Sequence, residues 1–438
     1  MSATISKVHI YEVDTTVADY RLESPTVGSR TEAYAIRLQG WAVDRRSRPV
    51  AITVWGKYVN FPESQIAISR PDVEALHPDV PWARESGFLV IVNLLGLPRE
   101  FDLFVSVVLE DGSSHPIALI HGSRALVEDE SEPMQPIMVT SLGRSGSSLV
   151  MDILSRHPEI VAYPVWDAEA KVSTYWAELL SVMTDPRSYL QPFASVMRQG
   201  RWWMGDGRQY DEPLADGTLE EWLGTEQVRE AARFCRERIT AFYTRLAEED
   251  GRQGAVYFAE KCGLRRPAYA ELLREIYPQT REILLVRDFR DMYCSMVAYS
   301  ERAGSDLFGR DSARSEEENI RMNLATQANL IAANWEARSD WAHLLRYEDL
   351  IRQPEESIQL LLSYLGFEGT DEIPAMLAAL PYGDFATDHA HGTSTSALSS
   401  IGRWRNELDP GLAAACESAL GDALAAFGYS TDRTTVTG

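Results

Sequence analysis

A β-branched run that breaks into a glycine- and serine-rich turn constrains the fold of this chain more than any other feature. Residues 136–141 read PIMVTS, the turn at 142–148 reads LGRSGSS, and apolar residues with helical spacing continue to residue 157. This order predicts a strand, a loop and a helix. Such a unit is typical of a parallel sheet with crossover helices, so an α/β domain is expected.

The remainder of the C-terminal region repeats the same alternation. Further strands are expected at 255–261, 281–288 and 341–346, and a helix at 292–303. Helical patterns also fill 226–249, 315–338, 354–365 and 410–426. Together they predict a three-layer, P-loop-like domain with a central parallel sheet.

The first part of the chain has a different texture. Short β-rich runs such as AITVWG (51–56), FLVIVNLL (88–95) and FDLFVSVVL (101–109) are separated by segments rich in Gly, Pro and Asp. This pattern predicts an antiparallel β-sandwich. We therefore expect a β-sandwich accessory domain at 1–126, an acidic linker at 127–136 and the α/β domain at 137–438.

Composition excludes several partners. The chain has 42 Lys and Arg against 65 Asp and Glu, a formal net charge of −23. Nucleic acid and anionic membranes would be repelled at long range, so neither is an expected partner, and an anionic ligand must meet a local basic pocket. No signal sequence or apolar run of membrane-spanning length is found, which predicts a cytoplasmic protein. No feature specifies an oligomeric state.

The four cysteines predict neither a metal site nor disulfides. Cys235, Cys262, Cys294 and Cys416 are far apart and form no CxxC pair. Zinc sites and disulfide frameworks both depend on closer or more regular spacing. We expect small buried apolar residues and no metal.

The loop after the first α/β strand suits a phosphate. Gly143 and Gly146 allow close backbone approach, Arg144 carries a charge, and hydroxyl donors come from Ser145, Ser147 and Ser148. The unpaired N–H groups and the dipole of the following helix favour an anion there. A triphosphatase loop would need G-x-x-x-x-G-K-[ST], which is absent. An ordinary turn capped by serines is the alternative.

A second pair of residues points to a second phosphate. The buried strand ILLV (283–286) leads into Arg287 at its carboxyl end, and Ser295 follows eight positions later. Open parallel sheets bind ligands at this end of their strands, and a guanidinium with a hydroxyl suits a phosphate. Two phosphate sites on one sheet favour a nucleotide phosphorylated at both ends.

These stretches resemble the sulfotransferases that use 3′-phosphoadenosine 5′-phosphosulfate (PAPS), chiefly their bacterial and carbohydrate-directed branches. SLGRSGSSL (141–149) is similar to the family's 5′-phosphosulfate loop, and LLVRDFRDMYCSM (284–296) to its 3′-phosphate element. Residues 344–367 and IGRWRNEL (401–408) resemble later family stretches in the expected order. The resemblance covers about 136–430 and implies PAPS as cosubstrate, without a metal.

The resemblance also implies roles for individual residues. Cosubstrate binding falls to the loop at 143–148, to Arg287 and Ser295, and to Gly402, Arg403 and Trp404. Cytosolic members have an Arg-Lys-Gly element before the last stretch. This chain has hydroxyls there instead, and Thr393 and Ser394 are the expected substitutes.

Three residues are expected to carry the chemistry: Arg144, Lys261 and Glu169. Arg144 would stabilise the leaving phosphate, and Lys261, in the family-like stretch FAEKCGLRRP (258–267), would touch donor or acceptor. A surface pair of Lys261 with Glu260 is the alternative. Glu169 matches a Glu that faces the acceptor in bacterial members and is the expected general base.

Other assignments for the base and the acceptor stay open. Asp167 could cap a helix, with Glu169 as a favourable acid of its first turn. His389, His391 and, less so, His157 are the second-choice bases. Trp202, Trp203 and Tyr210 are candidates for stacking on an acceptor, or for anchoring an irregular segment.

The expected function is therefore transfer of a sulfuryl group from PAPS to a hydroxyl of a small molecule or glycan, which releases adenosine 3′,5′-bisphosphate. Two alternatives remain. One is a nucleotide-dependent kinase, and the other is a non-catalytic nucleotide-binding module whose sandwich domain binds carbohydrate.

Overall fold

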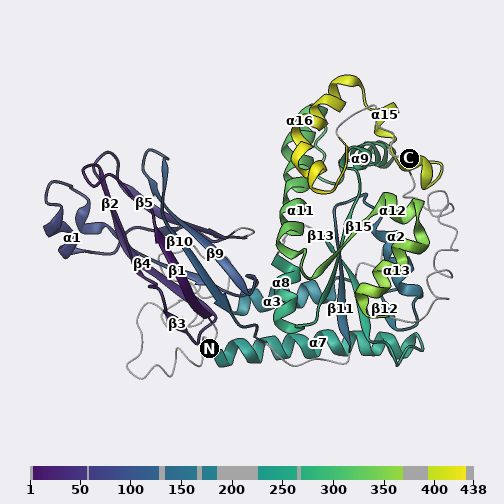
Figure 1. Ribbon diagram of the computed structural model, residues 1–438, viewed down its shortest axis with the longest axis horizontal. Helices are drawn as coiled ribbons and strands as arrows, with labels where there is room; N and C mark the ends of the chain where they lie inside the picture. Colours follow the sequence, from purple (N-terminus) through teal and green to yellow (C-terminus); the bar gives the residue numbers. More distant parts are fainter. Residues whose placement is uncertain are drawn as a thin grey trace. The chain divides into compact units, whose positions relative to one another are not determined.

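The computed structural model describes residues 3–56, 59–127, 134–164, 170–184, 225–263, 268–367 and 393–430 (Figure 1). The chain forms two compact units. The first comprises Met1–Ser131, Val172–Thr240 and Ala268–Pro278, and the second comprises Glu132–Lys171, Ala241–Pro267 and Gln279–Gly438. The domain boundaries expected near 126 and 137 stay a prediction, because compactness groups segments by proximity and does not delimit folding domains.

The N-terminal region is rich in antiparallel β-structure, as the sequence predicts. One sheet has the order β3-β1-β10-β9-β5-β6, with β7 also paired to β5, and a smaller sheet has the order β2-β4-β8. The strands are β1 (Ala3–Ile10), β2 (Ala18–Ser24), β3 (Arg30–Thr31), β4 (Ala35–Asp44), β5 (Pro49–Gly56), β6 (Val59–Asn60), β7 (Ser64–Gln65), β8 (Gly87–Asn93), β9 (Glu100–Leu109) and β10 (Ser114–Arg124).

Both sheets contribute to one apolar core. Ile52 of β5 and Val105 of β9 belong to the larger sheet, and Leu38 of β4 and Val90 of β8 to the smaller one, and all four are buried in a single cluster. Leu38 lies between the more exposed Arg37 and Gln39, since successive side chains of a strand point to opposite faces, whereas β8 is buried along most of its length. Short helices α1 (Pro71–Leu76) and η1 (Ala83–Glu85) lie between β7 and β8.

The second unit contains the parallel sheet that the sequence predicts. Its order is β12-β13-β11-β14-β15, and every pairing is parallel. The strands are β11 (Gln135–Ser141), β12 (Ile160–Ala162), β13 (Tyr257–Gly263), β14 (Arg281–Val286) and β15 (Ala342–Arg346). Ser141 pairs with Gly263 on one side and with Leu285 on the other, so the loops after these three strands emerge side by side.

Helices pack against both faces of this sheet (Figure 1). Ile283 and Leu285 point to the face covered by α2 (Ser147–Arg156), α12 (Tyr347–Arg352) and α13 (Pro354–Leu365). Leu284 and Val286 point to the face covered by α9 (Phe289–Ala303), α11 (Ala325–Arg338) and α16 (Pro410–Ala426). This strand is apolar on both faces because both are buried.

The remaining described helices are α3 (Val172–Thr184), α7 (Gln227–Glu249), α8 (Ala268–Ile276), α10 (Glu316–Asn319), the π-helical turn η3 (Ile320–Leu324), η5 (Leu398–Ser400) and α15 (Trp404–Glu407). The helix expected at 315–338 is thus interrupted by a π-turn. None of the described helices has the length and apolar composition needed to cross a bilayer. All four cysteines are free and buried, which confirms the expectation of buried positions.

A buried ion pair links the sheet to the helical layer. Arg338 of α11 lies 2.8 Å from a carboxylate oxygen of Glu282 on β14, and Thr140 of β11 donates to the same carboxylate. Glu282 and Arg338 are 0% and 3% exposed. Removing one partner of such a pair leaves an uncompensated buried charge.

We therefore expect Arg338→Met to destabilise the protein by about 3–5 kcal/mol. The matched control is Arg156→Met, which breaks an exposed ion pair with Asp152 on α2 and should cost less than about 1 kcal/mol. Urea-unfolding midpoints of the two variants provide the comparison. Equal midpoints would show that the Glu282–Arg338 pair does not hold α11 to the sheet.

Candidate functional site

The loop between β11 and α2 has a backbone conformation that requires glycine at one position. Gly146 is the N-cap of α2 and has φ of 97°, in the left-handed region. A Cβ placed there would lie 2.6 Å from Cδ2 of Tyr347. Both the dihedral angle and the close contact exclude other residues. The chain therefore enters α2 with backbone N–H groups presented at the helix N-terminus.

The serines of this loop differ in what they contact. The Ser145 hydroxyl is 1% exposed and donates to the carbonyl of Leu142 at 2.8 Å, which stabilises the turn itself. Ser147 and Ser148 begin α2 and are partly exposed. The Ser148 hydroxyl lies 3.0 Å from Nζ of Lys261.

Lys261 and its neighbour Glu260 are both buried, at 7% and 1% exposure. They are successive residues of β13 and point to opposite faces of the sheet. Glu260 accepts a hydrogen bond from the hydroxyl of Tyr243 on α7. The alternative of a surface pair between them is wrong, because the strand is central and buried on both faces. Lys261 lies beside the first turn of α2 through its contact with Ser148, and its role in binding donor or acceptor stays a prediction.

Arg287 follows β14 and is 5% exposed. Its guanidinium donates to the carbonyl of Arg144 at 3.2 Å and to that of Ser400 at 2.7 Å. Its third nitrogen, Nε, is buried and has no hydrogen-bond partner among the described residues. The group also lies over the ring of Tyr347, with 4.6 Å between Cζ and the ring centroid. An anion would satisfy N–H donors that these two carbonyls leave without a partner.

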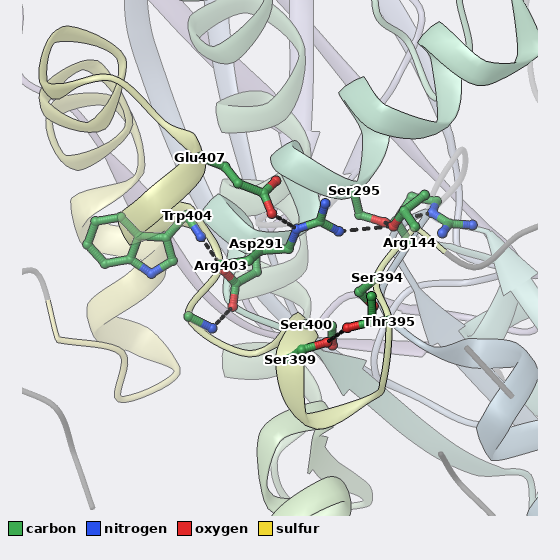
Figure 2. A network of polar contacts seen from close by, with 12 residues as sticks. Arg144, Asp291, Ser295, Ser394, Thr395, Ser399, Ser400, Arg403, Trp404 and Glu407 are labelled. Carbon is green, nitrogen blue, oxygen red and sulfur yellow. Dashed lines mark hydrogen bonds and ion pairs between the residues drawn. The ribbon is translucent and has the colours of Figure 1, made fainter. Parts of the chain in front are cut away.

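A chain of polar contacts joins three segments that are distant in sequence (Figure 2). Arg144 Nε donates to the hydroxyl of Ser295 at 3.0 Å, and that hydroxyl lies 2.8 Å from Oγ1 of Thr393. Arg403 donates to Thr393 at 3.0 Å and to Glu407 at 2.8 Å. The loop, α9 and the 393–403 segment therefore meet at one place, as the sequence predicts.

The electrostatics of this place favour an anion. Burial and, second, the nearby positive charge of Arg287 lower the pKa of Arg144 to about 10. The guanidinium stays charged at neutral pH but has lost much of its hydration. Tyr299 and Phe308 cover it, with ring centroids 4.8 and 5.9 Å from Cζ. A desolvated cation beside another cation gains most from a bound negative charge.

Asp291 of α9 holds the C-terminal segment in place, a role that sequence reasoning missed. One carboxylate oxygen accepts the N–H of Gly402 at 2.6 Å, and the other accepts that of Trp404 at 3.0 Å (Figure 2). These residues flank Arg403. The contact spans 111 residues or more in sequence, and only the aspartate in RDFRD hinted at it.

Two expected ligands have other contacts. Trp404 is fully buried in the apolar cluster between α9 and α16, and Arg290 lies over its ring at 3.9 Å. The Ser394 hydroxyl donates to the carbonyl of Ser396 at 3.1 Å. Direct ligand binding by these two side chains stays a prediction. Their observed contacts shape the segment that carries Thr393 and Arg403.

His157, a second-choice base, has a structural position. It packs against Phe367 with 4.1 Å between ring centroids and the ring planes tilted by 30°, and its Nδ1 accepts the N–H of Glu159 at 3.2 Å. Burial lowers its pKa. The predictions for Glu169, Asp167, His389, His391 and for Trp202, Trp203 and Tyr210 concern positions outside the described residues.

A parallel sheet with cations, hydroxyls and a glycine-rich loop at the carboxyl ends of its central strands is typical of proteins that bind phosphorylated ligands. A family model described as "Sulfotransferase family" matches residues 136–372, more than half of the chain. The chain therefore belongs to the sulfotransferase family, whose members transfer sulfuryl groups.

Solved structures similar to this chain include other sulfotransferases. The sulfotransferase domain from the curacin biosynthetic pathway is 16% identical, with 69% of this chain and 100% of that chain covered and a TM-score of 0.39. A sulfotransferase from Alicyclobacillus acidocaldarius is 16% identical (68% and 94% covered, TM-score 0.36). The mouse sulfotransferase SULT7A1, complexed with PAP, is 12% identical (68% and 86%, TM-score 0.37). The search of curated proteins found no match.

The pKa of Asp291 makes stability depend on pH. Burial and, second, the negative charge of Asp288 raise the pKa of Asp291 from 3.8 to about 7. Hydrogen bonds from Trp404 and Gly402 and the positive charge of Arg287 act in the opposite direction. Because the pKa of Asp291 is higher in the folded than in the unfolded state, protonation of this carboxyl stabilises the folded protein. This contribution to stability is fully present below about pH 3.8 and is lost as pH rises to about 7. We expect the unfolding free energy of the wild type to fall relative to that of Asp291→Asn between about pH 4.5 and 8.

Urea unfolding at several pH values measures this difference. The control is Asp72→Asn, because the hydrogen bond from Arg70 lowers the pKa of Asp72 to about 2. The contribution of Asp72 to stability changes only in more acidic solution. The difference in unfolding free energy between wild type and Asp72→Asn should therefore be constant over the same pH range. A flat curve for Asp291→Asn as well would refute the raised pKa.

Proposed function

We propose that this sulfotransferase uses PAPS as the sulfuryl donor and a hydroxyl of a small molecule or glycan as the acceptor. The observation that carries the proposal is the convergence of three arginines, Arg144, Arg287 and Arg403, with the hydroxyls of Ser295 and Thr393. A nucleotide with phosphates at both ends is an anion large and charged enough to engage all of them.

Two features of the site fit such a nucleotide. The buried Nε of Arg287 has no partner among the described residues, although a buried donor is normally satisfied. The first turn of α2 begins at a glycine with positive φ and is followed by two hydroxyls. Both features are suited to phosphate oxygens.

We assign the 3′-phosphate to Arg287, Ser295, Thr393 and Arg403, and the 5′-phosphosulfate to the P-loop-like segment 143–148 with Lys261. PAPS supplies the chemistry of a sulfuryl group attached to a phosphate leaving oxygen. Arg144 and the N–H groups of the loop bind the negative charge that develops on that phosphate. The Lys261 ammonium, 3.0 Å from the Ser148 hydroxyl, adds a second cation at the start of α2. These groups need no metal for this role.

The acceptor needs a base. We assign this role to Glu169, whose carboxylate takes the proton of the acceptor hydroxyl. Partial burial of a carboxylate raises its pKa and makes it a better base at neutral pH. We further propose that the antiparallel sheets of residues 1–126 form a β-sandwich accessory domain, separate from the catalytic domain at 137–438.

Binding of adenosine 3′,5′-bisphosphate tests the donor. We expect wild type to prefer it over ATP with magnesium, and Arg287→Ala to bind it roughly 10- to 100-fold more weakly, because a charge-assisted hydrogen bond is lost. Isothermal titration calorimetry measures both ligands. Arg156→Ala, at an exposed ion pair on α2, should bind like wild type. A preference for ATP, or no binding of the bisphosphate, would overturn the proposal.

Turnover tests the base. Glu169→Gln should lower kcat by about 10²- to 10⁴-fold, the usual contribution of general base catalysis, and leave bisphosphate affinity unchanged. Asp167→Asn is the matched control, since it removes a neighbouring carboxylate and should keep most of the activity. Steady-state rates with a hydroxyl acceptor separate the two variants. Undiminished kcat in Glu169→Gln would remove this residue from the role.

A further inference from the structure

We propose that Phe308 is a positioning residue, which shields the Arg144 guanidinium from water and fixes it for the 5′-phosphate of the sulfuryl donor. Phe308 lies in the loop 304–315, between α9 and α10. The inference rests on the proposed function, because that function assigns the 5′-phosphosulfate to the loop 143–148. It adds a residue from a segment to which the sequence patterns assign no role.

The ring of Phe308 packs against two successive residues of the loop 143–148. A Cβ added to Gly143 would lie 2.4 Å from Cδ1 of this ring, so any other residue there would displace the ring. The ring centroid lies 5.9 Å from Cζ of Arg144. Tyr299 covers the same guanidinium at 4.8 Å, and the two rings are 5.6 Å apart. Together the rings occupy space beside the cation that water would otherwise fill.

The backbone of Phe308 is strained. Its φ is 57°, in the left-handed region, which is costly for a residue with a bulky side chain. The side chain is 38% exposed, so it gains only part of the stabilisation that full burial of an aromatic ring would give. Strained residues of this kind are found where the position of a side chain serves a function. Here that position is over Gly143 and Arg144.

Two asparagines of the following helices hold the loop 304–315 in this conformation. Asn323, in the π-turn η3, donates to the carbonyl of Gly309. Asn319 of α10 is 2% exposed. Its amide accepts the N–H of Asp311 and donates to the carbonyl of the same residue, both at 2.9 Å. π-turns are frequent at functional sites, and this one carries the side chain that binds the residue after Phe308.

Charged groups hold the loop as well. Glu316 of α10 accepts a hydrogen bond from Tyr293 of α9 and forms an ion pair with Arg310. The carboxylate of Asp306 accepts the N–H and the hydroxyl of Ser312, both at 2.9 Å. The loop is therefore preorganised, and its ring covers the cation without a cost of ordering when the nucleotide binds.

Covering a cation strengthens its attraction for an anion. The interaction between two charges grows as the local dielectric constant falls, and apolar rings in place of water lower that constant. The 5′-phosphate gains negative charge as the sulfuryl group leaves, so the shielded Arg144 stabilises the transition state more than the ground state. Phe308 acts through Arg144 and contributes no reacting group of its own.

Calorimetric titration of the full chain with two nucleotides tests the proposal. One is adenosine 3′,5′-bisphosphate, and the other is adenosine 3′-phosphate, which lacks the 5′-phosphate. Phe308→Ala should bind the bisphosphate roughly tenfold more weakly than wild type and the monophosphate equally well. Phe308→Tyr keeps the ring and should bind both like wild type. The matched control is Leu360→Ala, at a leucine of α13 that is 58% exposed, and it should also leave both affinities unchanged.

Two further variants separate the ring from the backbone and from Arg144. Phe308→Gly also lacks the ring but relieves the positive φ, so it should lose as much bisphosphate affinity as Phe308→Ala while unfolding at a higher temperature. Arg144→Gln combined with Phe308→Ala should bind the bisphosphate no more weakly than Arg144→Gln alone, because residues that act through one another are not additive.

The possible failures are distinguishable. If wild type binds no bisphosphate, the proposed donor is refuted, and this inference with it. If wild type binds the bisphosphate, the inference alone is overturned by any of three results: unchanged affinity in Phe308→Ala, an equal loss for both nucleotides, or additive effects of the Arg144 and Phe308 substitutions.

Discussion

Three guanidinium groups brought to one edge of a parallel sheet form the constraint on which the site depends. Arg144, Arg287 and Arg403 converge there, and the last two are at most 7% exposed. Their charges oppose one another, which is part of the reason that the pKa of Arg144 falls to about 10. Neutral carbonyls and a hydroxyl satisfy some donors of Arg144 and Arg287 and leave their positive charge uncompensated, while Glu407 pairs with Arg403. An acidic chain can therefore hold an anion, because the local field outweighs the screened net charge at short range.

Two carboxylates near this cluster, Asp291 and Glu348, bind the backbone of the segments that carry the cations. Asp291 accepts the N–H groups on both sides of Arg403. Glu348 accepts the N–H of Asp288, the residue after Arg287, and the hydroxyl of Tyr429. Burial raises the pKa of Glu348. Asp291 and Glu348 thus fix the backbone and form no ion pair with Arg144 or Arg287, whereas Arg403 is paired with Glu407.

Sequence patterns predicted the features of the fold that short-range interactions determine. The strand, turn and helix around Gly146 and the pair of Arg287 and Ser295 were predictable, because apolar periodicity sets the elements and parallel register brings their carboxyl ends together. The burial of Trp404 and the contacts of Asp291 were not, because they depend on packing between segments more than 100 residues apart. Trp404 lies in a stretch that resembles the family, and only the structure shows that its side chain belongs to the core.

The two halves of the site are also coupled through the backbone. Arg144 has φ of 70°, a conformation that costs energy in a residue with a side chain. Arg287 donates to the carbonyl of this same residue, so the cation proposed for one phosphate stabilises the strained loop proposed for the other. Arg144 in turn donates to Ser295, beside Arg287 on the following helix. Each of the two proposed phosphate sites thus preorganises the other, and a ligand with two phosphates at the right separation would gain from both, whereas two separate anions would not.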